Sequence, residues 1–164
     1  MKLHRARPEE SGELSAFASA IFIEYYTRIN GAASATYMAE KFLSEKSICQ
    51  LMSDGAIFTI LCDDDDNYIG FSEYIEEKDG SLFLSKLYVT STERGKGYGR
   101  ILFDDCLAYA KERNLKRIYL TVNKHNTPSY EMYLHLGFKV IDAVVTDIGG
   151  GFVMDDYIME YRLR

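Results

Sequence analysis

The sequence predicts a mixed α/β or α+β domain, and three observations carry this prediction. Several runs of six to twelve residues are rich in β-branched and aromatic side chains, other segments repeat apolar residues at helical spacing, and Gly, Asn and Asp separate the two kinds. Their order is one strand, helices, three strands, a helix, a strand, a helix and two strands. The 164 residues include only two prolines and no internal repeat, so we expect a single domain spanning residues 1–164.

The amino-terminal third reads as a short strand followed by helices. Residues 2–7 alternate, and Pro8 with two following glutamates is typical of a helix start. Residues 13–29 carry an apolar helical stripe that Asn30-Gly31 ends. We expect a second helix over residues 34–44 and a further helical turn over 47–53.

Three strands with two tight turns should follow. The runs 56–62, 68–77 and 82–89 are separated by the acidic turn 63–67 and by Asp79-Gly80, a typical hairpin turn. The acidic turn does not fit a calcium loop, because its sixth and twelfth positions are Tyr68 and Tyr74. We interpret it as a solvated hairpin turn.

The last third alternates helices and strands. Residues 100–114 form a clear amphipathic pattern, 117–122 read as a strand, and 128–138 as a helix closed by Gly137. Two strands, 139–147 and 152–163, end the chain.

Charge and cysteine content limit the function classes. A net charge of −6 argues against a general nucleic-acid binder, and no apolar run approaches the length of a membrane span. Met1 is followed by charged residues rather than by an apolar signal segment. Cys49, Cys62 and Cys106 form no metal-binding or disulfide pattern, so we expect three buried thiols, no metal, no membrane and a cytoplasmic location.

The stretch "ERGKGYGR", residues 93–100, lies between a predicted strand and a predicted helix. It fits neither a P-loop nor a dinucleotide fingerprint, since its glycines alternate and position 102 is leucine. Bare glycines let backbone amides approach an anion at a helix start, and Arg94, Lys96 and Arg100 add positive charge. The alternative is a turn that uses glycine for tightness alone.

A second motif lies downstream, in "NKHNTPSYEMYLHLGF", residues 123–138. Together the two stretches resemble the GNAT superfamily of acetyl-CoA-dependent N-acetyltransferases. The first resembles the family's [RQ]-x-x-G-x-[GA] through Arg94, Gly97 and Gly99. The second resembles its N-x-x-[AS]-x-x-x-Y-x-x-x-G-F string, with matching residues Asn126, Ser129, Tyr133, Gly137 and Phe138. The resemblance covers residues 56–164, and the amino-terminal helices agree in type only.

The resemblance implies a fold and a cosubstrate. The fold would be a central, twisted, mostly antiparallel sheet of about seven strands with splayed strands four and five, flanked by about four helices. Acetyl-CoA would bind with its pyrophosphate on the amides of residues 94–100 and its pantetheine arm along the preceding strand. The residues implied in cosubstrate binding are Leu87, Val89, Arg94, Gly95, Lys96, Gly97, Tyr98, Gly99, Arg100, Asn126 and Tyr133.

The resemblance also implies a direct attack of a neutral amine on the thioester. The Val89 amide would stabilise the oxyanion and Tyr133 would protonate the leaving thiolate. Glu73 is the candidate base, although exposed hairpin carboxylates are the favoured interpretation of Glu73, Glu76 and Glu77. His125 is an alternative proton relay that otherwise reads as an exposed loop residue. Tyr133 could also be a core tyrosine.

The acceptor is predicted less directly. Aromatic residues with Glu24 and Glu40 in the first helices, and Asp155, Asp156 and Glu160 in the last strand, favour a cationic amine such as a polyamine. A peptide or protein amino group and an aminoglycoside are alternatives. A non-catalytic coenzyme A-binding regulator, a purely structural domain and a homodimer also stay open.

Overall fold

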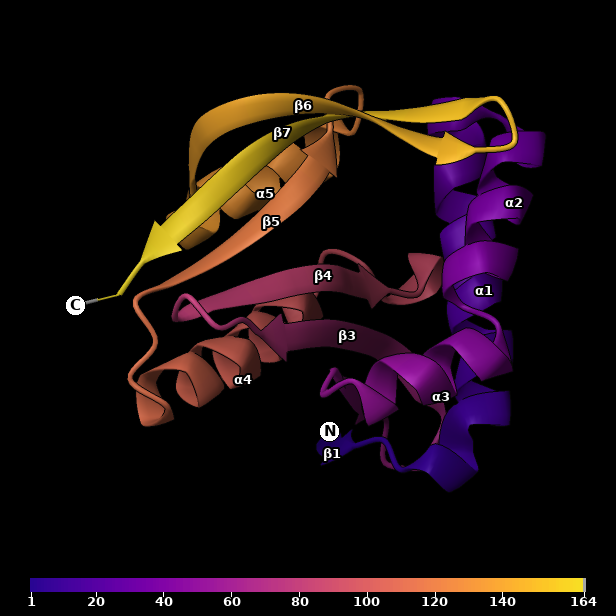
Figure 1. Cartoon of the computed structure of the whole chain (residues 1–164). Coiled ribbons are helices and arrows are strands. Elements are labelled where there is room, and N and C mark those ends of the chain that lie inside the picture. The colour runs from indigo at the N-terminus through magenta and orange to yellow at the C-terminus, as the bar shows by residue number, and fades with distance from the viewer. Residues whose placement is uncertain (164) are drawn as a thin grey trace.

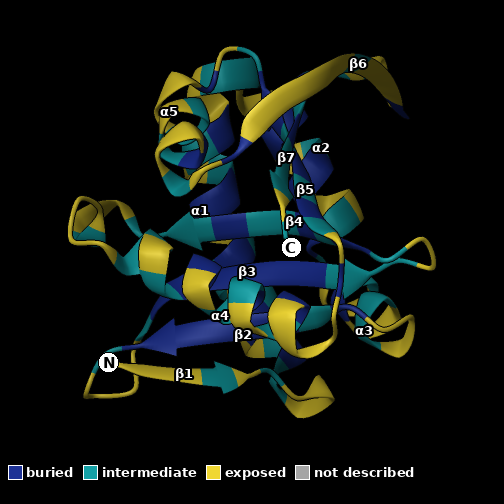
Figure 2. Cartoon of the chain, turned by 90° about the vertical axis from the view of Figure 1, so that its left-hand side faces the viewer, coloured by how far each residue is buried: buried dark blue, intermediate teal, exposed yellow. Residues whose placement is uncertain are grey.

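The computed structural model describes residues 1–163 and contains one seven-stranded sheet in the order β1-β2-β3-β4-β5-β7-β6. All neighbouring strands are antiparallel except β4 and β5, which are parallel. In Figure 2, β2 and β3 are mostly buried, whereas the edge strands β1 and β6 are largely exposed. The strands are β1 Lys2–Arg5, β2 Ile57–Cys62, β3 Tyr68–Glu76, β4 Ser81–Val89, β5 Arg117–Asn123, β6 Lys139–Gly149 and β7 Phe152–Arg162.

Five α-helices cover the two faces of this sheet, one more than expected. Helices α4 and α5 share one apolar core with β4, β5 and β7, and α1 to α3 share a second core with β2 and β3. A 3₁₀ turn at Pro8–Glu10 leads into α1. The helices are α1 Ser11–Asn30, α2 Ala32–Phe42, α3 Glu45–Ser53, α4 Tyr98–Glu112 and α5 Thr127–Leu136. None of these helices, within residues 1–163, has the length and apolarity to cross a bilayer.

The element types predicted from periodicity and turn residues are confirmed. The acidic turn is a hairpin turn in which Asp63 accepts amide hydrogen bonds from Asp65 and Asn67, and Asp66 takes a positive φ of 64°. The expectation of three buried thiols is wrong for Cys49. It is exposed on α3, where its thiol donates to Ser11 Oγ at 3.1 Å, whereas the neighbouring Ile48 is buried.

Strands β4 and β5 are paired at one end only. Their parallel register covers Ser81–Phe83 against Arg117–Tyr119, and beyond these residues the strands diverge (Figure 1). The pairing of β4 with β3 slips by one residue, since Glu73 opposes Lys86 whereas Tyr74 opposes Leu84, leaving Ser85 as a bulge. A bulge bends and twists its strand, and this one lies two residues beyond the end of the β4–β5 pairing. The expected splay is therefore present.

The β6–β7 hairpin extends from the sheet to the amino-terminal helices, and its tip lies beside α2 in Figure 1. The carbonyl of Ile148 accepts hydrogen bonds from Tyr37 Oη (3.1 Å) and Lys41 Nζ (2.6 Å). A Cβ atom at Gly149 would lie 2.7 Å from the Tyr37 hydroxyl. Glycine at this turn thus allows the hairpin to rest on α2, on the same side of the sheet as α1.

Candidate active site

The splay leaves backbone groups of β4 without a strand partner. The Thr90 amide bonds to the Ile69 carbonyl on β3 at 2.9 Å. Because hydrogen-bonding direction alternates along a strand, the amides of Leu87 and Val89 point away from β3, toward the gap before β5. Leu87 and Val89 are the two residues that the sequence predicted to pair with an extended ligand.

The glycine stretch lies at the end of this open strand edge. Gly95 and Gly97 take left-handed conformations, with φ of 80° and 84°, and Gly97 is the amino-terminal cap of α4. The first amides of α4, from Tyr98 onward, therefore emerge from the loop without a partner earlier in the helix. Together with the positive end of the helix dipole, these amides are suited to an anion.

A hollow of about 820 Å³, here called the outer groove, joins the open strand edge to this loop. Two predicted positions do not line it: Lys96 bonds to Glu93 at 2.9 Å, and Tyr133 lies deeper. The predicted residues that do line it are Leu87, Val89, Arg94, Gly95, Gly97, Tyr98, Gly99, Arg100 and Asn126.

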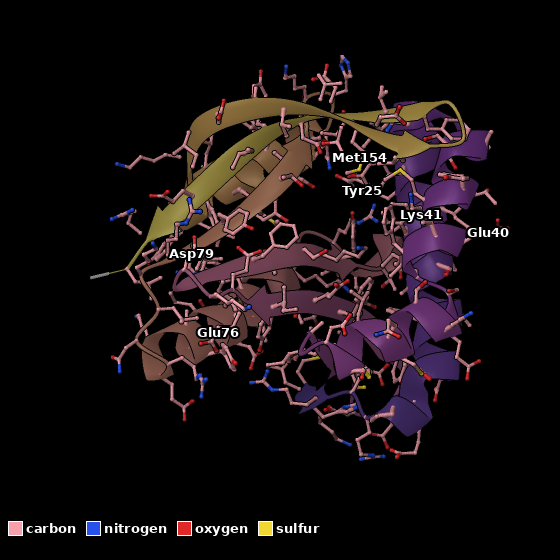
Figure 3. The ribbon with its side chains drawn as sticks, in the orientation of Figure 1. Tyr25, Glu40, Lys41, Glu76, Asp79 and Met154 are labelled. Carbon is pink, nitrogen blue, oxygen red and sulfur yellow. The ribbon has the colours of Figure 1, made fainter. Side chains whose placement is uncertain are left out.

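Tyr25 of α1 crosses the mouth of the gap, and sequence analysis did not single it out. Its hydroxyl donates to Asn126 Oδ1 and lies 2.8 Å from Ser129 Oγ, both at the start of α5. The guanidinium of Arg94 lies 5.1 Å above its ring and donates to the Val89 carbonyl at 3.0 Å. One tyrosine thus connects α1, α5 and the glycine loop. Tyr25 lies at apolar helical spacing in the sequence and therefore reads as a core residue. The adjacent pair Tyr25-Tyr26 brings two hydroxyl groups into this apolar stripe, and that was the one sequence feature that could have indicated a polar role. Tyr25 is labelled in Figure 3.

Asn126 is the amino-terminal cap of α5 and also presents a polar group to the groove. Its side-chain oxygen caps α5 by accepting from the Ser129 amide at 3.3 Å. The residue is buried and lines the outer groove. With its oxygen held by Ser129 and Tyr25, its amide nitrogen is the group left to bind a carbonyl in the groove.

A second hollow of about 170 Å³, here called the inner cavity, continues from the outer groove between β4 and β5. The two hollows share Leu87, Tyr88, Asn126 and Ser129 as lining residues. The inner cavity therefore reaches through the splayed strands toward α1 and α2. Its other lining residues include Phe22, Tyr26, Met38, Phe42, Phe83, Lys86, Thr121, Tyr133, Met154 and Asp156.

Tyr133 reaches the inner cavity from α5. Its side chain is 8% exposed and its ring packs edge-on against Phe138 at 5.5 Å. Burial, with a smaller contribution from Tyr26, raises the pKa of Tyr133 well above its ordinary value. The hydroxyl is therefore protonated at neutral pH, as a proton donor to a leaving group must be.

The favoured interpretation of Glu73 as an exposed hairpin carboxylate is wrong. Glu73 is 4% exposed and its carboxylate lies 3.4 Å from Lys86 Nζ on the opposite strand. Alternation along β3 places Glu73 and Glu76 on opposite faces, and accordingly Glu76 bonds to Tyr109 and Arg113 on the α4 side, whereas Glu77 bonds to Tyr119. Glu73 does not line either hollow, whereas its partner Lys86 lines the inner cavity.

The acidic residues expected around an acceptor are dispersed. Glu40 is exposed on the outer side of α2 in Figure 3, and Glu24 lines the outer groove. Asp155 pairs with Lys124 at 3.0 Å and Glu160 with Arg117 at 3.0 Å. His125 is exposed, as expected for a loop histidine, and lines the outer groove.

Asp156 is the exception among these acids, because it lines the inner cavity. It is 3% exposed, and within residues 1–163 its Oδ1 atom has no hydrogen-bond partner. Burial, with a smaller contribution from Asp155, raises the pKa of this carboxyl from 3.8 to about 6, against an opposing effect of Lys124. A pKa in this range suits a group that exchanges protons at neutral pH.

Comparisons with protein families and with known protein sequences agree on one family. The model of the Acetyltransferase (GNAT) family matches residues 11–138. An uncharacterized N-acetyltransferase of Mycobacterium tuberculosis is 28% identical over 121 residues, covering 74% of this chain and 77% of its own. The spermine/spermidine N(1)-acetyltransferase of Bacillus subtilis is 30% identical over 71 residues, covering 42% and 47%.

Solved structures share the fold over the full length. The PaiA N-acetyltransferase of Thermoplasma acidophilum, solved in complex with coenzyme A, superimposes with a TM-score of 0.83. The overlap covers 99% of this chain and 98% of that one at 21% identity. A GCN5-related N-acetyltransferase structure from Rhodopseudomonas palustris gives a TM-score of 0.81 at 17% identity, with coverage of 99% and 95%.

Proposed function

The chain belongs to the GNAT acetyltransferase family, and from this premise we propose that it transfers the acetyl group of acetyl-CoA to a primary amine. The observation that supports this most directly is the open edge of β4. Leu87 and Val89 direct their amides into the gap, and the gap leads to the glycine-capped start of α4. An extended chain that ends in a pyrophosphate matches both parts.

Each part of the cosubstrate has a complementary group in the proposal. The amides at the start of α4 and the side chains of Arg94 and Arg100 bind the pyrophosphate. The pantetheine arm follows β4, with the Asn126 amide nitrogen on one of its carbonyls. The acetyl group then lies where the outer groove meets the inner cavity. Lys96 faces Glu93 and, unlike Arg94 and Arg100, does not line the outer groove, so we assign it no direct contact.

The transfer itself needs three further groups. The amine nitrogen attacks the thioester carbon, forming the C–N bond while the C–S bond breaks. The Val89 amide donates to the carbonyl oxygen as negative charge builds there. Tyr133 donates its proton to the departing sulfur. Glu73, the base suggested by sequence, would have to act while it holds Lys86.

The acceptor we propose is a polyamine or another small cationic amine. Aromatic side chains of α1, α2 and β4 line the cavity on the acceptor side. The carboxylate of Asp156 also lines it, and its Oδ1 atom has no hydrogen-bond partner within residues 1–163. The partial match to a spermine/spermidine acetyltransferase is in keeping with this acceptor. A thioester-cleavage assay that detects free thiol, run with acetyl-CoA and matched concentrations of spermidine, a peptide amino terminus and an aminoglycoside, tests the proposal.

The expected result is fastest thiol release with spermidine. Faster release with the peptide or the aminoglycoside would overturn the acceptor but not the acetyltransferase. Tight acetyl-CoA binding without thiol release from any amine would favour a non-catalytic coenzyme A-binding regulator. No acetyl-CoA binding in calorimetry would overturn the cosubstrate assignment and favour a structural role.

A further inference from the structure

The inner cavity contains one carboxylate that the fold does not neutralise. Asp156 lies on β7 opposite Asn123 of β5, and it shares a strand face with Met154, which also lines the cavity. Its Oδ1 atom is buried and has no hydrogen-bond partner within residues 1–163. A buried ionisable group without a partner is costly, so its presence beside a cavity points to a ligand that supplies the missing partner.

The other charged groups around the cavity are already paired. Lys86 on β4 faces Glu73 at 3.4 Å, and Lys124 after β5 faces Asp155 at 3.0 Å on the surface side of β7. The cavity therefore retains the negative charge of Asp156. Its walls include six aromatic rings, which favour a cation that loses water on entering: Phe22, Tyr26, Phe42, Phe83, Tyr88 and Tyr133.

The position of Asp156 relative to the gap matters as much as its charge. The carboxylate lines the cavity from β7, whereas Tyr133, Asn126 and Ser129 line it from α5. The proposed acetyl group would lie between them, at the junction with the outer groove. An amine held by Asp156 would thus approach the thioester from the side opposite to the cosubstrate arm.

We propose that Asp156 binds the ammonium group of the acceptor in the inner cavity and accepts its proton. This inference rests on the proposed acetyl transfer and names the acceptor-side residue of the same site. One ammonium proton moves to the Asp156 carboxylate and is later released to water, which frees the nitrogen lone pair. After attack, the nitrogen loses a second proton to water, and Tyr133 takes back from water the proton that it gave to sulfur.

The surrounding groups leave Asp156 as the residue that titrates near neutral pH in this cavity. Burial raises the pKa of Tyr26 to about 12 and those of Tyr88 and Tyr133 well above their ordinary values, so all three stay neutral. Lys86 and Lys124 each face a carboxylate. A carboxyl with a pKa of about 6 is ionised at pH 7 and can accept a proton.

The cavity also limits the acceptor. About 170 Å³ is similar to a cavity that holds one benzene molecule. A slender, unbranched aliphatic primary amine fits this space and places its charged end on Asp156. We therefore infer that the acceptor class is a primary alkylammonium, with spermidine and 1-aminobutane as probes.

The test compares the wild type with Asp156→Asn and Asp155→Asn, using spermidine and 1-aminobutane between pH 5 and 9. In the wild type, kcat/KM should level off above about pH 6 because Asp156 deprotonates the bound ammonium. In D156N it should fall about 10²- to 10⁴-fold at pH 7 and keep rising with pH, because only free amine then reacts. D155N changes a surface carboxylate on the same strand and should stay within about twofold.

Acetyl-CoA affinity, measured by calorimetry, should be equal in the three proteins. Wild-type kcat/KM values in D156N, or loss of the plateau in Glu73→Gln but not in D156N, would overturn the assignment. Acetylation of a bulky aminosugar but of neither alkylamine would overturn the acceptor class.

A second measurement does not depend on turnover. At pH 8, 1-butylammonium should raise the melting temperature of the wild type and of D155N but not that of D156N. An equal rise in all three would overturn the inference even in an active enzyme. If no amine is acetylated yet this pattern appears, the proposed transfer fails while the ammonium site stands.

Discussion

Replacing Asp156 with asparagine should change how the stability of the protein depends on pH. The folded pKa of about 6 lies above the ordinary value of 3.8, so folding favours the protonated carboxyl. A group of this kind costs nothing below pH 3.8, and its cost grows as pH rises through about 6. At 1.36 kcal/mol per pKa unit, the wild type loses about 3 kcal/mol of unfolding free energy by neutral pH.

About 2 kcal/mol of this loss falls between pH 4.5 and pH 7.5. Urea unfolding of the wild type and of D156N at both pH values measures this loss, because the change in unfolding free energy of one protein can be subtracted from that of the other. The unfolding free energy of the wild type should fall by about 2 kcal/mol relative to that of D156N. With an m-value of about 2 kcal/mol/M, this equals a midpoint shift of about 1 M.

Comparing pH slopes removes the constant cost of burying an asparagine amide in the same place. D155N keeps the buried carboxylate and loses only the smaller contribution of Asp155 to its pKa, so it should retain most of the wild-type slope. If D156N and the wild type run parallel between pH 4.5 and 7.5, the Asp156 carboxyl titrates normally, and the argument from its burial fails.

Two further substitutions test the cosubstrate side. Gly97→Val places a β-branched residue at a φ of 84° at the cap of α4 and should weaken acetyl-CoA binding, measured by calorimetry, at least about tenfold, or about 1.4 kcal/mol. The control Gly31→Val, at a similar φ of 87° after α1, should leave this affinity unchanged, and equal affinities for both variants would contradict the loop assignment. Tyr133→Phe should lower kcat and kcat/KM about 10- to 100-fold with acetyl-CoA affinity nearly constant, whereas a lower melting temperature with full turnover would mean that Tyr133 is a core residue.

Much of the fold follows from local signals in the sequence. Turn residues such as Asp79-Gly80 and Asn30-Gly31 separate segments whose apolar period is either two or near 3.6, and each segment formed the predicted element. The strand faces were also predictable, since alternation alone put Glu73 opposite to Glu76. The glycine stretch and Asn126 stand at helix starts because glycine at positive φ and a side-chain cap are local requirements.

The site was less predictable where it depends on long-range packing. In β7 both faces carry apolar residues, so alternation separates Asp155 from Asp156 without saying which one faces inward. The burial of Glu73 depends on Lys86, whose position follows from the bulge at Ser85. Tyr25 finds its partners 101 and 104 residues away in the sequence, a pairing that no local pattern encodes.

The half-open β4 edge has a consequence for how the protein avoids misassembly. Unpaired strand edges invite other polypeptides to add, which is a route to aggregation. In this molecule the edge faces inward, between the two halves of the sheet, and the bond from Tyr25 to Asn126 closes α1 against α5 across its mouth. A foreign β-strand, with side chains on both faces, would have to break that closure to enter. The width of the gap thus excludes polypeptide strands, whereas a thin, linear molecule can still enter it.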